Sequence, residues 1–164
     1  MSRLFLLRHG IALPHGTPGV GDDDRPLTPE GERQVGEVAA GLKRLKIEPD
    51  RIVTSPLPRA RRTAEITADV LGRTKLLENS DIMKPGSSPR AIRDWLGAAA
   101  DSNLMLVGHN PSLSALLAIL VGLPEGAPAF DLKKGGVAAL RSDDRGGYQV
   151  HWLATPKMFR RLTG

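Results

Sequence analysis

Apolar residues recur at helical spacing in four segments of the chain. Each segment begins with a polar residue followed by proline, at Thr28-Pro29, Ser55-Pro56, Ser88-Pro89 and Asn110-Pro111. The polar side chain can accept hydrogen bonds from free amides of a first helical turn, and proline at the next position loses no hydrogen bond. The pattern therefore predicts four amphipathic helices that start at these pairs and pack their apolar faces on a core.

Short, nearly continuous apolar runs lie between the predicted helices, at residues 4–7, 52–53 and 104–107. Such runs are typical of strands buried on both faces of a parallel sheet. The end of the chain differs, because residues 137–141 and 148–153 flank a turn-rich segment and predict an antiparallel hairpin at the sheet edge. The order of elements predicts an α/β three-layer sandwich whose central sheet is mostly parallel, with an antiparallel C-terminal hairpin.

Length and composition are those of one globular unit. The chain has 164 residues, of which 40% are hydrophobic and 25% charged, and this predicts a single domain over residues 1–164. The apolar stretch before Arg8 has four residues, whereas a secretory signal has about 7 to 15 and a membrane span about 20. Cysteine is absent, which excludes disulfides and thiolate nucleophiles. We expect a cytoplasmic protein without a membrane partner.

The chain is basic, with a formal net charge of +5. A basic surface attracts phosphates of any origin, so nucleic acid is one possible partner. Aromatic residues make up only 4% of the chain, which leaves little for stacking on single-stranded bases. We therefore expect no nucleic-acid partner, and assign some of the arginines to a small anion.

Two histidines directly follow predicted buried strands, in Arg8-His9-Gly10 and in Gly108-His109-Asn110. Ligands of open α/β sheets bind beyond the carboxyl ends of the strands. Arg59 falls near the first turn of the helix that follows the run at residues 52–53, and so belongs to the same edge. The sequence thus predicts that Arg8, His9, Arg59 and His109 gather at one edge of the sheet.

This combination of side chains favours an anion site over a metal site. Histidine is a common metal ligand, but two neighbouring arginines repel a cation and no carboxylate cluster accompanies the histidines. Arginine presents a planar fork that matches phosphate oxygens. With no cysteine and no serine in a nucleophile elbow, a neutral imidazole is the natural nucleophile for phosphoryl transfer.

Four sequence blocks surround these residues. They are Leu7-Arg8-His9-Gly10, Arg25-Pro26-Leu27-Thr28-Pro29-Glu30-Gly31, Ser55-Pro56-Leu57-Pro58-Arg59-Ala60 and Val107-Gly108-His109-Asn110-Pro111. In content and order they resemble the histidine phosphatase superfamily, which includes phosphoglycerate mutases and acid phosphatases. The short length and the forms of the second and last blocks are most similar to the SixA branch, the phosphohistidine phosphatases.

The resemblance implies a phosphoglycerate mutase-like fold and a metal-independent hydrolase. It implies that His9 attacks phosphorus in line and becomes phosphorylated, while Arg8, Arg59 and His109 form the phosphate pocket. Water then hydrolyses the intermediate, and neither a metal nor an organic cofactor is needed.

The sequence departs from the family pattern at two places. Many members have a phosphate-binding asparagine a few residues after the Arg-His-Gly block, and here that contact is missing or replaced. The proton donor is also not evident: Asp81 is the first candidate for this acid and Glu78 the second. Of the remaining histidines, we expect His15 to be a surface residue of a loop and His151 to be structural in an edge strand.

The chain has little room for insertions that would cap the pocket, and an open rim favours a bulky substrate. We therefore expect a phosphorylated protein, with phosphohistidine as the substrate group, because imidazole is a better leaving group than an alkoxide. One alternative is a phosphatase for a small phosphomonoester such as a sugar phosphate or nucleotide. Another is a phosphoprotein-binding module without turnover, against which the presence of His9 argues.

Overall fold

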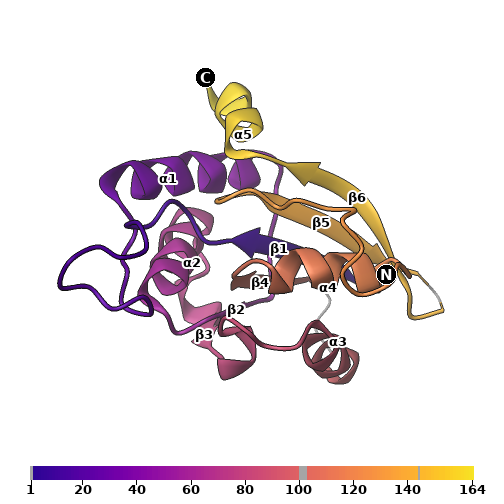
Figure 1. The fold of residues 1–164 in the computed structure, drawn as a ribbon. Helices are drawn as coiled ribbons and strands as arrows, with labels where there is room; N and C mark the ends of the chain where they lie inside the picture. Colours follow the sequence, from indigo (N-terminus) through magenta and orange to yellow (C-terminus); the bar gives the residue numbers. More distant parts are fainter. Residues whose placement is uncertain (1, 100–102, 144) are drawn as a thin grey trace.

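One mixed six-stranded sheet, in the order β3-β2-β4-β1-β5-β6, forms the centre of the molecule (Figure 1). The computed structural model describes residues 2–99, 103–143 and 145–164. The strands are β1 (Arg3–Arg8), β2 (Arg51–Thr54), β3 (Leu77–Asn79), β4 (Asn103–Gly108), β5 (Val137–Ser142) and β6 (Tyr148–Ala154). Strands β1 to β4 run parallel to one another, and β5 and β6 form an antiparallel hairpin in which β5 pairs antiparallel with β1. The predicted sheet is confirmed.

The central strand β1 is buried on both faces, as its apolar run predicts. Leu4 and Leu6 point to one face and join one core cluster, whereas Phe5 and Leu7 point to the other face and join a second cluster. This division follows from the two-residue repeat of a strand. Hydrophobic burial on both sides therefore fixes the strand whose carboxyl end carries Arg8.

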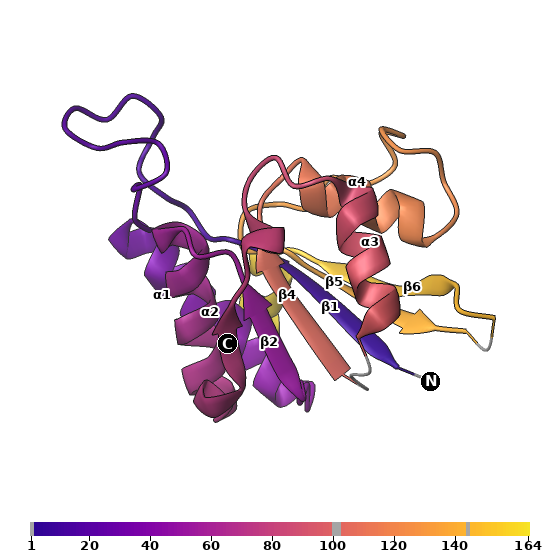
Figure 2. The ribbon, with the colours of Figure 1, turned by 90° about the horizontal axis from the view of Figure 1, so that it is seen from below.

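Helices cover both faces of the sheet (Figure 2). They are α1 (Pro29–Arg44), α2 (Pro58–Leu71), α3 (Pro89–Ala98), α4 (Ser112–Leu120) and α5 (Pro156–Thr163), with short 3-10 turns η1 (Thr74–Leu76) and η2 (Asp81–Met83). Residues of α1, α2 and α5 belong to the core cluster on one face, and residues of α3 and α4 belong to the cluster on the other. The three-layer α/β sandwich is thereby confirmed.

The predicted helix starts hold for two of the four helices. Thr28 caps α1 and accepts a hydrogen bond from the Gly31 amide, and Ser88 is the capping residue of α3. Helix α2 instead begins at Pro58, with Leu57 as its cap, so the cap predicted at Ser55 is wrong. The Ser55 hydroxyl accepts the Leu57 amide at 3.3 Å, outside the helix. Helix α4 also begins later than the Asn110-Pro111 pair, at Ser112.

The C-terminal helix α5 was not among the four predicted helices. It begins with the same device as the others, Thr155 followed by Pro156. Phe159 of α5 is fully buried against α1, where a Cβ on Gly41 would lie 2.5 Å from its ring. The eight residues of α5 contain too few apolar positions to show a helical repeat in the sequence. Of these positions, only Pro156 and Phe159 are buried.

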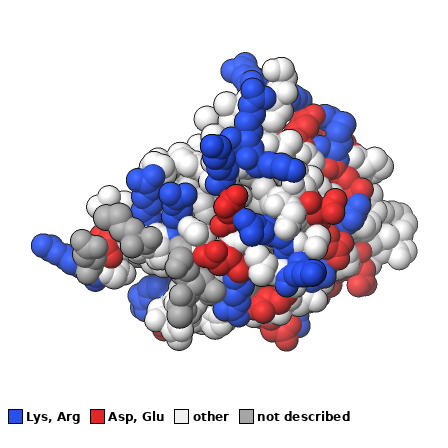
Figure 3. Space-filling model, turned by 180° about the vertical axis from the view of Figure 1, so that it is seen from behind, with Lys and Arg blue, Asp and Glu red and all other residues white. Residues whose placement is uncertain are grey.

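Basic and acidic side chains are interspersed on the back of the molecule (Figure 3). Basic side chains gather at the end that carries α5, whose last turn contains Arg160 and Arg161. In the part of the chain that the structure describes, no helix has the length and apolar character needed to cross a membrane.

Candidate active site

The four residues predicted for the site line one small pocket of about 220 Å³ at the carboxyl ends of the parallel strands. Arg8 ends β1 and His9 follows it, Arg59 lies in the first turn of α2, and His109 follows β4. The pocket is also lined by Ala12, Leu13, Pro14, His15, Asp22, Arg25, Pro85, Asn110 and Lys134. The structure thus brings the four residues together, as the strand ends predict.

His9 is held in one orientation by its own backbone neighbour. Its Nδ1 lies 2.7 Å from the carbonyl oxygen of Gly10, and because a carbonyl only accepts, Nδ1 carries the proton. The other ring nitrogen, Nε2, then holds the lone pair of the neutral imidazole. The geometry assigns the tautomer in which Nε2 is free to accept a proton or to attack an electrophile.

The surroundings keep His9 neutral at physiological pH. Burial lowers the pKa of His9 to about 4, the hydrogen bond to Gly10 opposes this, and the positive charges of Arg59, Arg8 and Lys134 lower it further. Only 7% of the residue is exposed. A neutral imidazole can attack an electrophile, whereas an imidazolium cannot.

His109 is oriented by Ser55. Its Nε2 lies 2.8 Å from the Ser55 hydroxyl. That hydroxyl accepts the Leu57 amide, and among the described residues its own proton has no acceptor other than His109 Nε2, so we assign the Ser55 O–H as the donor and Nε2 as the acceptor. The proton of the neutral ring is then on Nδ1. Burial first, and then the charges of His9 and Arg59, lower the pKa of His109 to about 3. The ring centroids of His9 and His109 are 5.1 Å apart.

The two arginines are each anchored by one nitrogen. Arg8 donates through Nη1 to the carbonyl of Leu132, and Arg59 donates through Nη1 to the carbonyl of Asp22, both at 3.0 Å. Burial lowers the pKa of both guanidinium groups, but arginine remains charged in proteins. The anchors hold two positive charges beside the histidines.

Three buried N–H groups of these residues have no hydrogen-bond partner among the described residues: Arg8 Nε, Arg59 Nε and His109 Nδ1. A buried donor without a partner is costly and rare in folded proteins. Together with the two guanidinium charges, they indicate a site whose hydrogen bonding is completed by a bound anion.

The sequence block at residues 25–31 holds the backbone that follows His9 in place. The Thr28 amide donates to the carbonyl of Ile11 at 2.9 Å, and the Thr28 side chain caps α1 through Gly31. A Cβ on Gly31 would lie 2.1 Å from the Ile11 carbonyl oxygen, so only glycine allows α1 to approach this closely. The Gly10 amide donates to Thr63 of α2 at 3.1 Å, which completes the support.

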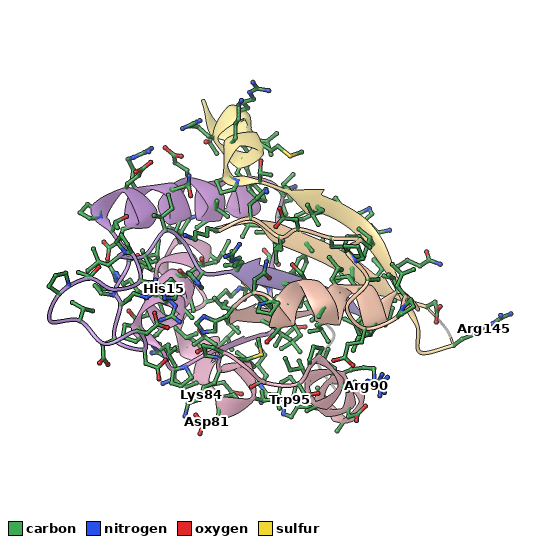
Figure 4. The ribbon with its side chains drawn as sticks, in the orientation of Figure 1. His15, Asp81, Lys84, Arg90, Trp95 and Arg145 are labelled. Carbon is green, nitrogen blue, oxygen red and sulfur yellow. The ribbon has the colours of Figure 1, made fainter. Side chains whose placement is uncertain are left out.

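Arg25 organises the loop that borders the pocket, a role that the sequence analysis did not assign. It donates through Nε to Asp22 at 2.8 Å, through Nη1 to the Leu13 carbonyl at 2.7 Å and through Nη2 to His15 at 3.2 Å. His15, labelled in Figure 4, also pairs with Asp22 and is 78% exposed. It is a surface residue as predicted, but it lies at the pocket mouth.

Neither predicted proton donor lies at the pocket. Asp81 belongs to η2, where its carboxylate is 79% exposed and pairs with Lys84 at 3.0 Å, and Figure 4 shows both at the outer edge of the molecule. Glu78 lies on the edge strand β3 and accepts a hydrogen bond from Arg51 at 2.9 Å. The geometry therefore does not support either residue as the acid, and the carboxylate that lines the pocket is Asp22.

His151 lies exposed on β6, away from the pocket-lining residues. Within residues 2–99, 103–143 and 145–164, no three His, Asp or Glu side chains gather as a group that could hold a metal ion.

Comparisons with known proteins agree with this geometry. Residues 4–82 match the model of the histidine phosphatase superfamily (branch 1). The chain is 38% identical to an uncharacterized protein of Picosynechococcus sp. over 146 residues, which are 85% of this chain and 84% of the relative. It is 27% identical to the phosphohistidine phosphatase SixA of Escherichia coli, and the match covers 94% of each chain.

A solved structure gives the same result. The structure of the protein histidine phosphatase SixA complexed with tungstate superimposes with a TM-score of 0.84 at 25% identity, covering 95% of this chain and 98% of that one. The sequence blocks, the fold and these relatives agree. The chain therefore belongs to the histidine phosphatase superfamily and is an enzyme of the phosphatase type.

Proposed function

We propose that this protein is a phosphohistidine phosphatase that acts through a covalent phosphohistidine on His9. The observation that carries the proposal is the hydrogen bond from His9 Nδ1 to the Gly10 carbonyl. It leaves the Nε2 lone pair of a neutral ring inside a pocket lined by Arg8, Arg59 and His109.

The reaction takes place in two displacements. First, the Nε2 lone pair of His9 attacks phosphorus in line, the bond from phosphorus to the leaving nitrogen or oxygen breaks, and the leaving group takes a proton from solvent. Water then attacks the phosphorus of phospho-His9 and loses a proton. The P–N bond to His9 breaks, inorganic phosphate leaves, and the free imidazole is restored.

Charge in the pocket stabilises the phosphoryl group during both displacements. Arg8 and Arg59 supply fixed positive charges, and His109 supplies an N–H donor oriented by Ser55. Preorganised donors of this kind lower the barrier because they need not reorganise as charge moves onto the equatorial oxygens.

The size of the pocket supports a large substrate. Pockets that enclose small molecules usually measure about 300–1,000 Å³, and this one has about 220 Å³. It can receive a phosphoryl group but leaves the remainder of the substrate outside. A phosphorylated side chain of a protein meets this condition.

The carboxylate at the pocket also favours phosphohistidine. Desolvation raises the pKa of Asp22, but the hydrogen bond and charge of Arg25 outweigh it and lower the pKa below its usual value. Asp22 is therefore ionised at neutral pH and holds no proton for a leaving group. A P–N bond to imidazole needs less proton donation than a P–O bond to an alkyl alcohol, and the similarity to SixA points the same way.

The test is a panel of substrates with a trapping experiment. We expect a phosphohistidine peptide to be hydrolysed faster than sugar phosphates and nucleotides, and acid-labile label to appear on the parent enzyme. His9→Ala should abolish both turnover and label with the fold retained, whereas His151→Ala, an exposed histidine outside the pocket, should behave like the parent. Acid-stable label, or label that persists in His9→Ala, would contradict the covalent mechanism.

The panel also distinguishes the alternatives. Fastest turnover of a sugar phosphate or nucleotide would assign the protein to the small-molecule phosphatases. Failure to release phosphate even from an aryl phosphate, combined with tight binding of a phosphopeptide, would indicate a binding module without turnover.

A further inference from the structure

We infer that Lys134 is an additional substrate-binding residue, whose ammonium group binds an oxygen of the phosphoryl group in the place of the contact that the sequence lacks after His9. The inference rests on the proposed function, because it concerns the same phosphoryl pocket. Lys134 lies between α4 and β5 and is one of the residues that line the pocket.

The turn that carries Lys134 is tied directly to the nucleophile. The amide of Gly135 lies 3.1 Å from the carbonyl oxygen of Arg8 and 3.0 Å from that of His9. A shift of this turn would therefore break hydrogen bonds to the backbone of the catalytic strand end. Lys134 is attached to the part of the chain that positions His9.

The conformation of the turn requires its two glycines. Gly135 has φ of +71°, and a Cβ on Gly136 would lie 2.8 Å from the carbonyl oxygen of Lys133. The Gly136 amide donates to that carbonyl at 2.7 Å. Residues with a Cβ disfavour both arrangements, so the Lys-Lys-Gly-Gly sequence specifies this tight turn and hence the site from which Lys134 projects.

The residue just before the turn adds a second anchor. The Leu132 carbonyl accepts from Arg8 Nη1 and from Asn110 Nδ2, both at 3.0 Å. The segment thereby connects a phosphate-binding arginine with the loop that carries His109. Lys134 therefore lies between two residues, Leu132 and Gly135, whose backbone groups are hydrogen-bonded to residues of the pocket.

The charge of Lys134 is free for a ligand. The neighbouring Lys133 pairs with Asp131, and Lys84 pairs with Asp81. Lys134 has no hydrogen-bond or ion-pair partner in the part of the chain that the structure describes, although its charge acts on His9. The ammonium group of Lys134 is therefore available to an anion bound in the pocket that it lines.

Lysine suits this position because of its shape. A compact ammonium on a flexible stem can follow a phosphoryl oxygen as the group becomes trigonal and then moves to His9, whereas the rigid fork of arginine is better matched to a fixed geometry. Arg8 and Arg59 hold the phosphoryl group from anchored positions, and Lys134 closes the open side.

The experiment compares Lys134→Ala with Lys133→Ala, which removes the adjacent lysine that is already paired. Inhibition by orthovanadate and turnover of an aryl phosphate are measured for both, and for Lys134→Arg. We expect Lys134→Ala to bind vanadate about 10- to 100-fold more weakly and to lose a similar factor in kcat/KM, as for loss of one hydrogen bond between charged groups. Lys133→Ala should stay within about two-fold of the parent, and Lys134→Arg, which keeps the charge but replaces the compact ammonium with a rigid fork, should recover only part of the vanadate binding.

Three results distinguish a failure of the Lys134 assignment from a failure of the proposed function. If the parent protein forms phosphoenzyme on His9 but Lys134→Ala binds vanadate like the parent, the assignment of Lys134 is wrong and the proposed function stands. Equal weakening by Lys133→Ala and Lys134→Ala would also overturn the assignment, because it would show a general effect of surface charge. If the parent forms no phosphoenzyme, the proposed function itself fails.

Discussion

The hydroxyl of Ser55 lies 2.8 Å from Nε2 of His109 and joins the end of β2 to the loop after β4. Ser55 does not cap α2, because Leu57 precedes Pro58 and is extended, so the helix begins only at Pro58. The contact between Ser55 and His109 underlies the assignment of the His109 proton to Nδ1. Groups that orient an active-site histidine in this way affect activity without touching the substrate.

Ser55→Ala should therefore lower kcat/KM by about 10- to 100-fold, in the range known for residues that orient functional histidines. The fold should persist, because the change removes one oxygen from a buried site. Steady-state kinetics with an aryl phosphate, together with a thermal melt, measures the two effects. Unchanged kinetics in a folded variant would show that Ser55 does not orient His109.

The pH dependence of the first displacement should have an unusual acid limb. In the proposed mechanism His9 attacks only when it is neutral, and its pKa is lowered to about 4, mainly by burial. The rate of phosphoenzyme formation should therefore persist from pH 7 to about pH 5 and fall only below. Single-turnover measurements, corrected for ionisation of the substrate, test this. An acid limb near the ordinary histidine pKa of about 6.5 would contradict it.

The same shifts predict acid sensitivity of the fold. The folded-state pKa values of His9 and His109, about 4 and about 3, lie below the unfolded value. The unfolded state therefore binds more protons below about pH 6.5, and the free energy of unfolding decreases as the pH falls from there toward the folded values. Above pH 6.5 this stabilisation is fully present. Denaturant midpoints at pH 7 and pH 4.5 measure the effect.

A matched pair of variants provides the control for acid sensitivity. The free energy of unfolding of His109→Gln should decrease less between pH 7 and pH 4.5 than that of the parent protein, because the variant lacks one histidine whose pKa is lowered in the folded state. His151→Gln changes an exposed histidine of the edge strand and should keep the parental decrease. Identical pH dependence in His109→Gln and the parent would show that His109 does not titrate as described.

Gly31→Ala should destabilise the fold and the site together. Its Cβ would lie 2.1 Å from the Ile11 carbonyl oxygen, and overpacking of this kind costs about 1–3 kcal/mol. Because Ile11 follows the Arg8-His9-Gly10 block, activity should fall as well. Gly36→Ala on the same helix is the control, since no atom lies within 4 Å of its Cβ. That variant should gain roughly 0.5–1 kcal/mol from helix propensity.

Turnover should survive a chelator and be inhibited by vanadate. The pocket is positively charged before substrate arrives, through Arg8, Arg59 and Lys134, and would repel a divalent cation. Vanadate resembles the pentacoordinate transition state and should bind more tightly than phosphate. Loss of activity with EDTA that zinc or manganese restores would indicate a metallophosphatase and overturn the mechanism.

The layers of the fold and the principal residues of the pocket could be predicted from the amino-acid sequence. Strand β1 is buried on both faces and therefore appears in the sequence as a continuous apolar run. Helix α1 is buried on one face and therefore appears as apolar residues at helical spacing. Arg8, His9 and His109 could be placed at one edge because each directly follows or ends a buried strand, and parallel strands align their carboxyl ends.

The roles of the remaining residues depend on how distant segments pack together, which the sequence pattern does not reveal. Asp81 and Glu78 have suitable chemistry and lie in a suitable segment, but their carboxylates pair with Lys84 and Arg51 away from the pocket. Nothing local distinguishes a loop carboxylate that faces a site from one that faces solvent. The orientation is set by how the segment packs on the sheet.

Arg25 and Lys134 are the opposite case, because both line the pocket although neither was predicted as a site residue. Arg25 acts through hydrogen bonds to His15 and Asp22, and Lys134 lies at the pocket because Gly135 is bonded to the carbonyl of His9. The Arg25 contacts lie within one loop of irregular backbone, which leaves no periodic pattern in the sequence. The Gly135 contact joins segments that are far apart in the chain, and it forms only when the turn before β5 packs against the end of β1. For these reasons both roles could be found only in the folded molecule.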